Sequence, residues 1–137
     1  MESLEQIQRS ISDEFEIFET WIEKYEYIID LGKQLEDFPD DQMTEDNKVH
    51  GCQSSVWFVT SLEDELFRCK ATSDSAIVSG LIALLMRIYN NQKPSEIVAA
   101  EPEFISLIGL DEHLSPTRNN GLNVMIQRIK KDATSML

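Results

Sequence analysis

The chain contains few of the residues from which several kinds of site are built. Among 137 residues it has two cysteines, two histidines, five glycines and four prolines. These cysteines and histidines do not reproduce any zinc-ligand spacing, and two cysteines are better read as free thiols than as a disulfide framework. The sequence also has no glycine-rich phosphate loop and no Gly-x-Ser-x-Gly elbow. It therefore predicts neither a metal site nor a bound nucleotide.

Positive charge and long apolar runs are scarce as well. The chain carries 12 Lys and Arg against 25 Asp and Glu, a formal net charge of -13. Such a balance argues against nucleic acid and anionic membranes as partners, and leaves open a basic protein partner or a charge that only maintains solubility. No apolar run reaches membrane-spanning length, and the first residues lack the pattern of a signal peptide. We expect a soluble, cytoplasmic protein of a reducing compartment, with a single domain over residues 1–137.

Capping residues predict where most of the helices begin. Ser3 with Gln6 and Thr20 with Glu23 have the capping-box spacing, and Ser115 precedes a proline at the first helical position. The predicted helices cover residues 4–18, 21–35, 76–89, 95–100 and 104–107, with a last helix from Ser115-Pro116 onward. The segment 76–89 is apolar on nearly every side, so we expect a buried central helix.

Two strands are predicted at residues 54–60 and 66–71, joined by a polar turn at residues 62–64. A hairpin with Phe58 opposite Phe67 would place Val56 opposite Cys69, with all four side chains on one buried face.

Continued past the strand ends, the same register brings Cys52 near Ser73 and Asp74. It separates Cys52 from Cys69 by roughly 13 Å, too far for a disulfide.

The chemistry is expected at Gly51-Cys52, where a turn leads into the first strand. A glycine beside a cysteine allows a sharp turn and leaves the sulfur unshielded on one side. The N-terminus of the helix at residues 76–89 and the cation of Arg118 could each lower the pKa of the Cys52 thiol, whereas Asp74 would oppose them. The residues alone leave two alternatives open, a reactive thiol and an ordinary small buried side chain. His50 is expected to be a surface loop residue, and His113 a helix-end or loop residue.

Several blocks in a fixed order resemble the SufE family of sulfur-acceptor proteins. They are residues 21–35 (WIEKYEYIIDLGKQL), Gly51-Cys52-Gln53-Ser54 with Val56-Trp57, Ser73-Asp74, Ile77-Val78, Gly80-Leu81, and Leu114-Ser115-Pro116-Thr117-Arg118 with Asn120-Gly121-Leu122. The resemblance covers most of the chain. Three departures are Ser75 where the family often has alanine, Glu36-Asp37 in place of a more proline-rich segment, and the additional Cys69.

The resemblance implies a compact α+β domain similar in fold to SufE and IscU, with helices around a three-stranded antiparallel sheet whose third strand lies near residues 47–49. It implies that Cys52 accepts sulfane sulfur from a cysteine desulfurase of the SufS type, stimulates that enzyme, and passes the sulfur to an iron-sulfur scaffold complex. Arg118 would stabilise the anionic sulfur, and Asp74 would neighbour the acceptor loop or contact a partner. No cofactor is expected on this chain, because the pyridoxal phosphate belongs to the desulfurase, and the free protein is expected to be a monomer or a homodimer.

Two other functions remain open from the sequence. The first is a thiol-dependent enzyme, a reductase or hydrolase acting through Cys52, although no resolving cysteine or general base is evident. The second is an interaction domain without catalysis, for which the acidic charge is the main argument.

Overall fold

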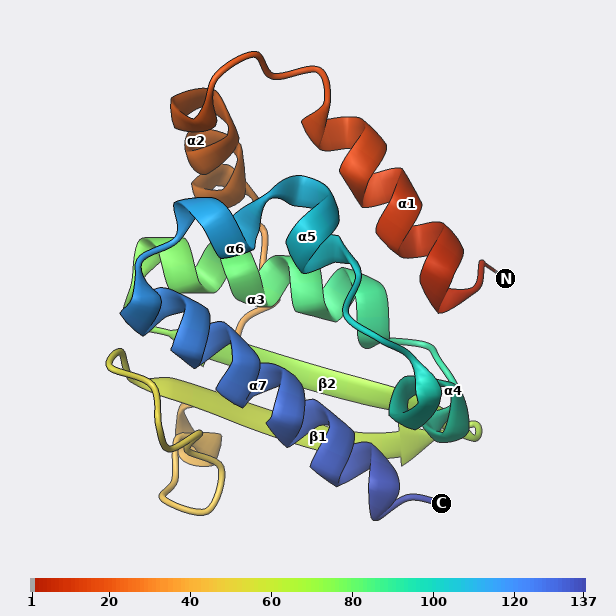
Figure 1. Cartoon of the computed structure of the whole chain (residues 1–137). Coiled ribbons are helices and arrows are strands. Elements are labelled where there is room, and N and C mark those ends of the chain that lie inside the picture. The colour runs from red at the N-terminus through yellow and green to blue at the C-terminus, as the bar shows by residue number, and fades with distance from the viewer. Residues whose placement is uncertain (1) are drawn as a thin grey trace.

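The computed structural model describes residues 2–137 and places helices around a two-stranded antiparallel sheet, an α+β arrangement. The elements follow in the order α1 (Leu4–Phe15), α2 (Trp21–Gly32), the 3-10 helix η1 (Asp40–Gln42), β1 (Val56–Glu63), β2 (Leu66–Ser73), α3 (Ala76–Tyr89), α4 (Pro94–Ala99), α5 (Phe104–Ile108), α6 (Leu110–His113) and α7 (Pro116–Thr134). Figure 1 shows α3 and α7 running along the hairpin, with α1 and α2 beyond α3. No helix among residues 2–137 combines the length and the apolar character needed to cross a bilayer.

The helix starts agree with the capping residues. Ser3 and Gln6 form a reciprocal capping box, and the side chains of Thr20, Ser75 and Ser115 each accept a hydrogen bond from the backbone N–H three residues later. The ends are less well predicted, since α1 ends at Phe15 and α2 at Gly32, each three residues before the expected end. Both helices give way to single turns, which an apolar pattern does not distinguish from helix. The short helix α6 was not expected.

The predicted register of the hairpin is wrong by four positions. Phe58 pairs with Ala71 instead of Phe67, and Cys69 pairs with Thr60 instead of Val56. The turn consists of Asp64 and Glu65, both with positive φ, which lengthens both strands beyond the expected ends. Because the register shift of four positions is an even number, the side chains of the two strands that were predicted to share a face still do so. The expected four residues, Val56, Phe58, Phe67 and Cys69, are all buried.

The expectation of three strands is also wrong, because the sheet has two. Residues 47–49 lie beside β1, where the third strand was expected, but they form only one bridge, Lys48 to Trp57. Two hydrogen bonds flank it, Val49 N–H to Val56 O at 2.8 Å and Phe58 N–H to Asn47 O at 2.8 Å. One turn covers residues 45–47 and the next begins at His50, so the extended stretch is too short for a strand.

Helix α3 is held by very close packing against α2. A Cβ atom added to Gly80 would lie 2.1 Å from the carbonyl oxygen of Ile28, so only glycine allows this approach. On its other side, the apolar residues of α3 pack against the buried face of the hairpin, including Phe58 and Phe67. The central helix is thus fixed from two sides, and its N-terminal half provides a firm wall for the segment around Cys52.

Candidate functional site

Cys52 lies in a short loop, residues 50–54, whose two ends are fixed to the hairpin. We call this segment the thiol loop. At its N-terminal end Val49 is hydrogen-bonded to Val56, and at its C-terminal end Ser55 contacts Asp74 twice. Within the loop, Gly51 has a φ of 100°, a conformation that favours glycine. The turn predicted at Gly51-Cys52 is therefore present, on a rigid base.

The thiol loop lies against α7. The side-chain amide of Asn120 donates to the carbonyl oxygen of Gly51 at 3.4 Å. The Sγ atom of Cys52 lies 3.7 Å from the carbonyl oxygen of Gly121, and a Cβ atom at Gly121 would also lie 3.7 Å from that sulfur. That is an ordinary van der Waals distance, so the thiol would just touch a side chain at Gly121, and any larger group on the sulfur would meet it. The Ser115 to Leu122 block joins the thiol loop in space, although it follows some 65 positions later in the chain.

Cys52 opens into a small pocket of about 100 Å³ between the thiol loop, α3 and α7. The residues that line it are Cys52, Gln53, Ser54, Val78, Leu81, Thr117, Arg118, Gly121, Leu122 and Met125. The wall is mixed, with the apolar side chains of Val78, Leu81, Leu122 and Met125 beside polar groups, and Arg118 is its charged member. Such a pocket partly shields a group on the sulfur from water, and it has one cation among its lining residues.

The expected lowering of the Cys52 pKa is not observed. Burial raises the pKa of this half-buried thiol above its ordinary value. The N-terminal turns of α3 reach the pocket through Val78, yet the direction of the Cys52 pKa shift is set by the loss of hydration. Cys69 is buried as predicted, and burial together with the charge of Asp132 raises its pKa to about 12. Both cysteines are free. In the conformation described, Cys52 is a protected thiol and Cys69 an inert one.

The other two predicted site residues occupy different positions. Arg118 lines the pocket, and its Nη1 atom donates to the hydroxyl of Tyr25 at 2.8 Å. Asp74 is exposed and does not line the pocket; its Oδ1 atom accepts from Ser55 N–H at 3.1 Å, and its own N–H donates to Ser55 O at 3.3 Å. Asp74 therefore holds Ser55, the residue that follows the thiol loop and lies three positions after Cys52, while Arg118 lies at the pocket itself.

The pocket lining offers little for acid-base catalysis. Among the described residues, those lining it include no histidine and no carboxylate. His50 is exposed and faces Glu45 at 3.1 Å, as a surface loop residue would, and the ring of His113 stacks on Trp21 with centroids 4.3 Å apart. Within residues 2–137, no three side chains of the kinds that bind metals are gathered into a potential site. The geometry favours direct chemistry at sulfur over acid-base catalysis.

Sequence reasoning gave no role to Tyr25, although it lies within the first block of the family resemblance. Its hydroxyl and ring both contact Arg118, 93 positions away. The helical spacing of Trp21 and Tyr25 indicated only a shared face of α2, and nothing in that pattern identifies a partner so distant in the chain.

Comparisons with known proteins identify the family of the chain. The chain matches the SufE family model, described as an Fe-S metabolism associated domain, over residues 9–133. It is 42% identical to an uncharacterized SufE-like protein of Rhizobium meliloti (strain 1021), over 100% of this chain and 99% of the relative. A second uncharacterized SufE-like protein, from Rhizobium etli, is 40% identical over 97% of this chain and 90% of the relative.

A solved structure shares the fold. The solution structure of a hypothetical protein from Thermus thermophilus superimposes with a TM-score of 0.78, covering 95% of both chains at 17% identity. That likeness concerns the fold alone. From the family model and the relatives, which both span nearly the whole chain, the protein belongs to the SufE family, whose domain is associated with iron-sulfur metabolism.

Proposed function

We propose that the protein is a sulfur carrier in which Cys52 accepts sulfane sulfur from a cysteine desulfurase of the SufS type and delivers it to an iron-sulfur scaffold complex. The observation that carries this proposal is a free thiol opening into a small pocket of mixed polar and apolar lining, in a chain of the SufE family. Transfer of sulfur between proteins needs a protected product and a nucleophile that becomes accessible on docking; the pocket supports the first and movement of the thiol loop would supply the second.

The proposed reaction is thiolate exchange at sulfur. The Cys52 thiol gives up its proton to solvent, and its sulfur attacks the terminal sulfur of the persulfide on the desulfurase. A bond forms between Cys52 Sγ and that terminal sulfur, while the bond to the desulfurase cysteine breaks. The departing thiolate takes up a proton, so neither protons nor electrons are gained overall. Delivery to the scaffold repeats the exchange with a thiolate of the scaffold as the attacking group.

The buried state of Cys52 implies that the thiol loop moves during transfer. In the pocket its pKa is raised by burial, which keeps the thiol protonated and unreactive. Displacement into a wetter, more cationic interface would return the pKa toward its ordinary value and expose the sulfur. We therefore expect hydrogen exchange in residues 50–54 to change when a desulfurase binds. Equal protection with and without the enzyme would contradict loop movement.

The remaining residues take supporting roles in this proposal. Arg118, at the pocket, stabilises the anionic sulfur, and Asp74 holds the end of the thiol loop from an exposed position where a partner could also contact it. The chain acts as one sulfur-acceptor domain in the cytoplasm, as a monomer or homodimer. It carries no cofactor of its own, since the pyridoxal phosphate that generates the persulfide resides in the desulfurase.

A sulfur-transfer assay tests the proposal directly. The purified protein is mixed with a SufS-type cysteine desulfurase and cysteine, and intact mass is measured. Wild type should gain the mass of sulfur and Cys52→Ser should not. Cys69→Ser is the matched control, because it removes the buried thiol and should still gain sulfur. A wild-type chain without any added sulfur would refute the carrier function.

Two further readouts belong to the same assay. Alanine release by the desulfurase should accelerate with wild type and not with Cys52→Ser, because only a chain that removes the sulfur frees the enzyme for another turnover. A thiol-dependent enzyme is the alternative, and the residues lining the pocket supply no base for it. Reduction or hydrolysis of a substrate by wild type alone, without the desulfurase, would favour that alternative.

A further inference from the structure

Arg118 is held by an aromatic side chain and not by a carboxylate. Its Nη1 atom lies 2.8 Å from the hydroxyl oxygen of Tyr25, and its guanidinium carbon lies 5.9 Å from the centre of the same ring. Within residues 2–137, none of the ion pairs includes Arg118. Its positive charge is therefore ordered in space yet not neutralised by a neighbouring side chain.

The position of Arg118 in its helix is unfavourable for helix stability. It lies in the first turn of α7, where the positive end of the helix dipole repels a cation. The same arrangement concentrates positive potential where Arg118 lines the pocket, on a chain whose net charge is -13. An anion entering the pocket thus meets the Arg118 cation and the first turn of α7 on an otherwise acidic protein.

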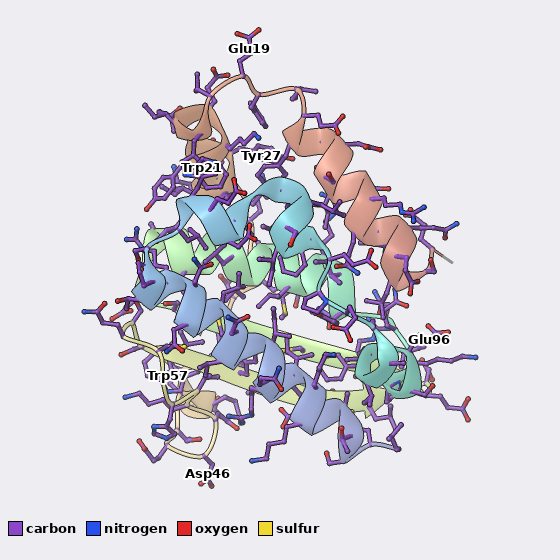
Figure 2. The ribbon with its side chains drawn as sticks, in the orientation of Figure 1. Glu19, Trp21, Tyr27, Asp46, Trp57 and Glu96 are labelled. Carbon is purple, nitrogen blue, oxygen red and sulfur yellow. The ribbon has the colours of Figure 1, made fainter. Side chains whose placement is uncertain are left out.

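The side chain that holds Arg118 is itself firmly placed. Tyr25 is half-buried on α2, one turn after Trp21, whose ring stacks on His113 with an interplanar angle of 16°. That stack joins α2 to the segment just before α7. Figure 2 shows Trp21 on the side of α2 away from α1, and Tyr27 between α2 and α1. Trp21 and Tyr25 thus contact α6 and α7, through His113 and Arg118, whereas Tyr27 packs against Phe15 of α1.

We propose that Tyr25 is a positioning residue that fixes the guanidinium of Arg118 at the Cys52 pocket, ready for an anionic sulfur group. An exposed arginine without this contact would sample many rotamers, and each anion would have to order it on arrival. The identity of the anion rests on the proposed function, but the placement of the cation by Tyr25 does not. The two can therefore be tested separately.

Alkylation of Cys52 by two small reagents measures the cation without any partner protein. Iodoacetate is anionic and iodoacetamide is neutral, and both attack the thiolate, so the ratio of their rates cancels the thiolate fraction. In Tyr25→Phe this ratio should fall by roughly three- to tenfold, the range that corresponds to the net contribution of one ordinary, solvent-exposed hydrogen bond. Tyr25→Leu removes the ring as well and should lower the ratio to that of Arg118→Ala.

Tyr27→Phe is the matched control, since it removes a hydroxyl from the same helix. That hydroxyl donates to Glu14 at 2.7 Å, away from the pocket, so the ratio should equal that of wild type. Circular dichroism spectra of all variants should superimpose. A wild-type ratio in Tyr25→Phe would overturn the proposal, as would an equal fall in Tyr25→Phe and Tyr27→Phe.

A double variant separates positioning from any independent action of Tyr25. If Tyr25 acts through Arg118, then Tyr25→Phe should have no effect once Arg118 is alanine. An undiminished effect in that background would overturn the proposal. The sulfur-transfer assay is read independently: a chain that gains no sulfur refutes the carrier function, and the alkylation ratio still tests Tyr25. Where sulfur is gained, Tyr25→Phe should slow its acquisition to a similar extent.

Discussion

Replacing Gly121 by alanine should separate the stability of the protein from its capacity to protect sulfur. Gly121 lies inside α7, where alanine is favoured over glycine by about 1 kcal/mol. The added Cβ would lie 3.7 Å from Cys52 Sγ, an ordinary van der Waals distance, so the thiol form should tolerate it. We expect Gly121→Ala to raise the melting temperature by roughly 4 °C.

The unfavourable effect of Gly121→Ala, a loss of protection, should appear only when Cys52 carries an additional sulfur. The pocket has a volume of about 100 Å³. Gly121 lines this space, so a methyl group on it would reduce the room left for an added sulfur. Overpacking of about 1 to 2 kcal/mol would lower the sequestered fraction of the persulfide by a factor of roughly 5 to 30. The added sulfur in Gly121→Ala should therefore be more exposed to reagents.

The assay measures how quickly a phosphine reductant removes sulfur from persulfidated protein, followed by intact mass. Asn123→Ala is the control, because Asn123 is an exposed α7 residue that does not line the pocket and alanine there also favours helix. Gly121→Ala should lose sulfur roughly 5 to 30 times faster than wild type. Asn123→Ala should lose it at the wild-type rate. Equal loss in Gly121→Ala and wild type, with the higher melting temperature present, would refute a protecting pocket.

Three other measurements follow from the structure. Gly80→Ala would place a Cβ atom 2.1 Å from the Ile28 carbonyl oxygen, so it should destabilise the protein by about 3 kcal/mol or more and lower the melting temperature by roughly 10 °C; an unchanged melting curve would contradict the helix contact. Alkylation of Cys52 by iodoacetamide should rise with pH through an inflection above that of an unstructured cysteine peptide, because burial raises its pKa; an inflection at or below the peptide value would refute the buried thiol. The hydrogen bond from Arg87 lowers the pKa of Glu14, so this pair stabilises the fold at neutral pH, and its contribution is lost as the pH falls below about 4. The loss of stability caused by Glu14→Gln, measured by urea unfolding, should therefore shrink over that range. A loss that stays constant with pH would count against the pair.

Local signals predicted much of the fold. The helix starts capped by Ser3, Thr20 and Ser115 were recognisable, because the cap and the backbone donor it satisfies lie within four residues of each other. The buried face of the hairpin was recognisable for a similar reason, since alternation fixes which face each side chain takes. It does not fix the pairing. An Asp64-Glu65 turn with two positive φ values lacks the Asn-Gly signature that would have set the register.

The site was predicted less completely than the fold. The position of Cys52 in a glycine turn follows from its neighbours in sequence, but the direction of its pKa shift depends on how deeply the loop is packed against α7. Similarly, the contact between Tyr25 and Arg118 joins helices far apart in the chain, and only the folded arrangement brings them together. Long-range packing therefore decides the electrostatics of this site, and local pattern does not.

The anchoring of the thiol loop sets how far sulfur can travel on this protein. Cys52 lies three positions after Val49 and three before Ser55, and both of these residues are hydrogen-bonded to the hairpin region. A fully extended chain advances about 3.3 to 3.6 Å per residue, so the Cα atom of Cys52 can swing no more than about 10 Å from either anchor. The loop is thus a short segment anchored at both ends, with a limited range of motion. Donor and acceptor proteins must each bring their own sulfur site to within that radius, which makes the precision of docking a condition for transfer.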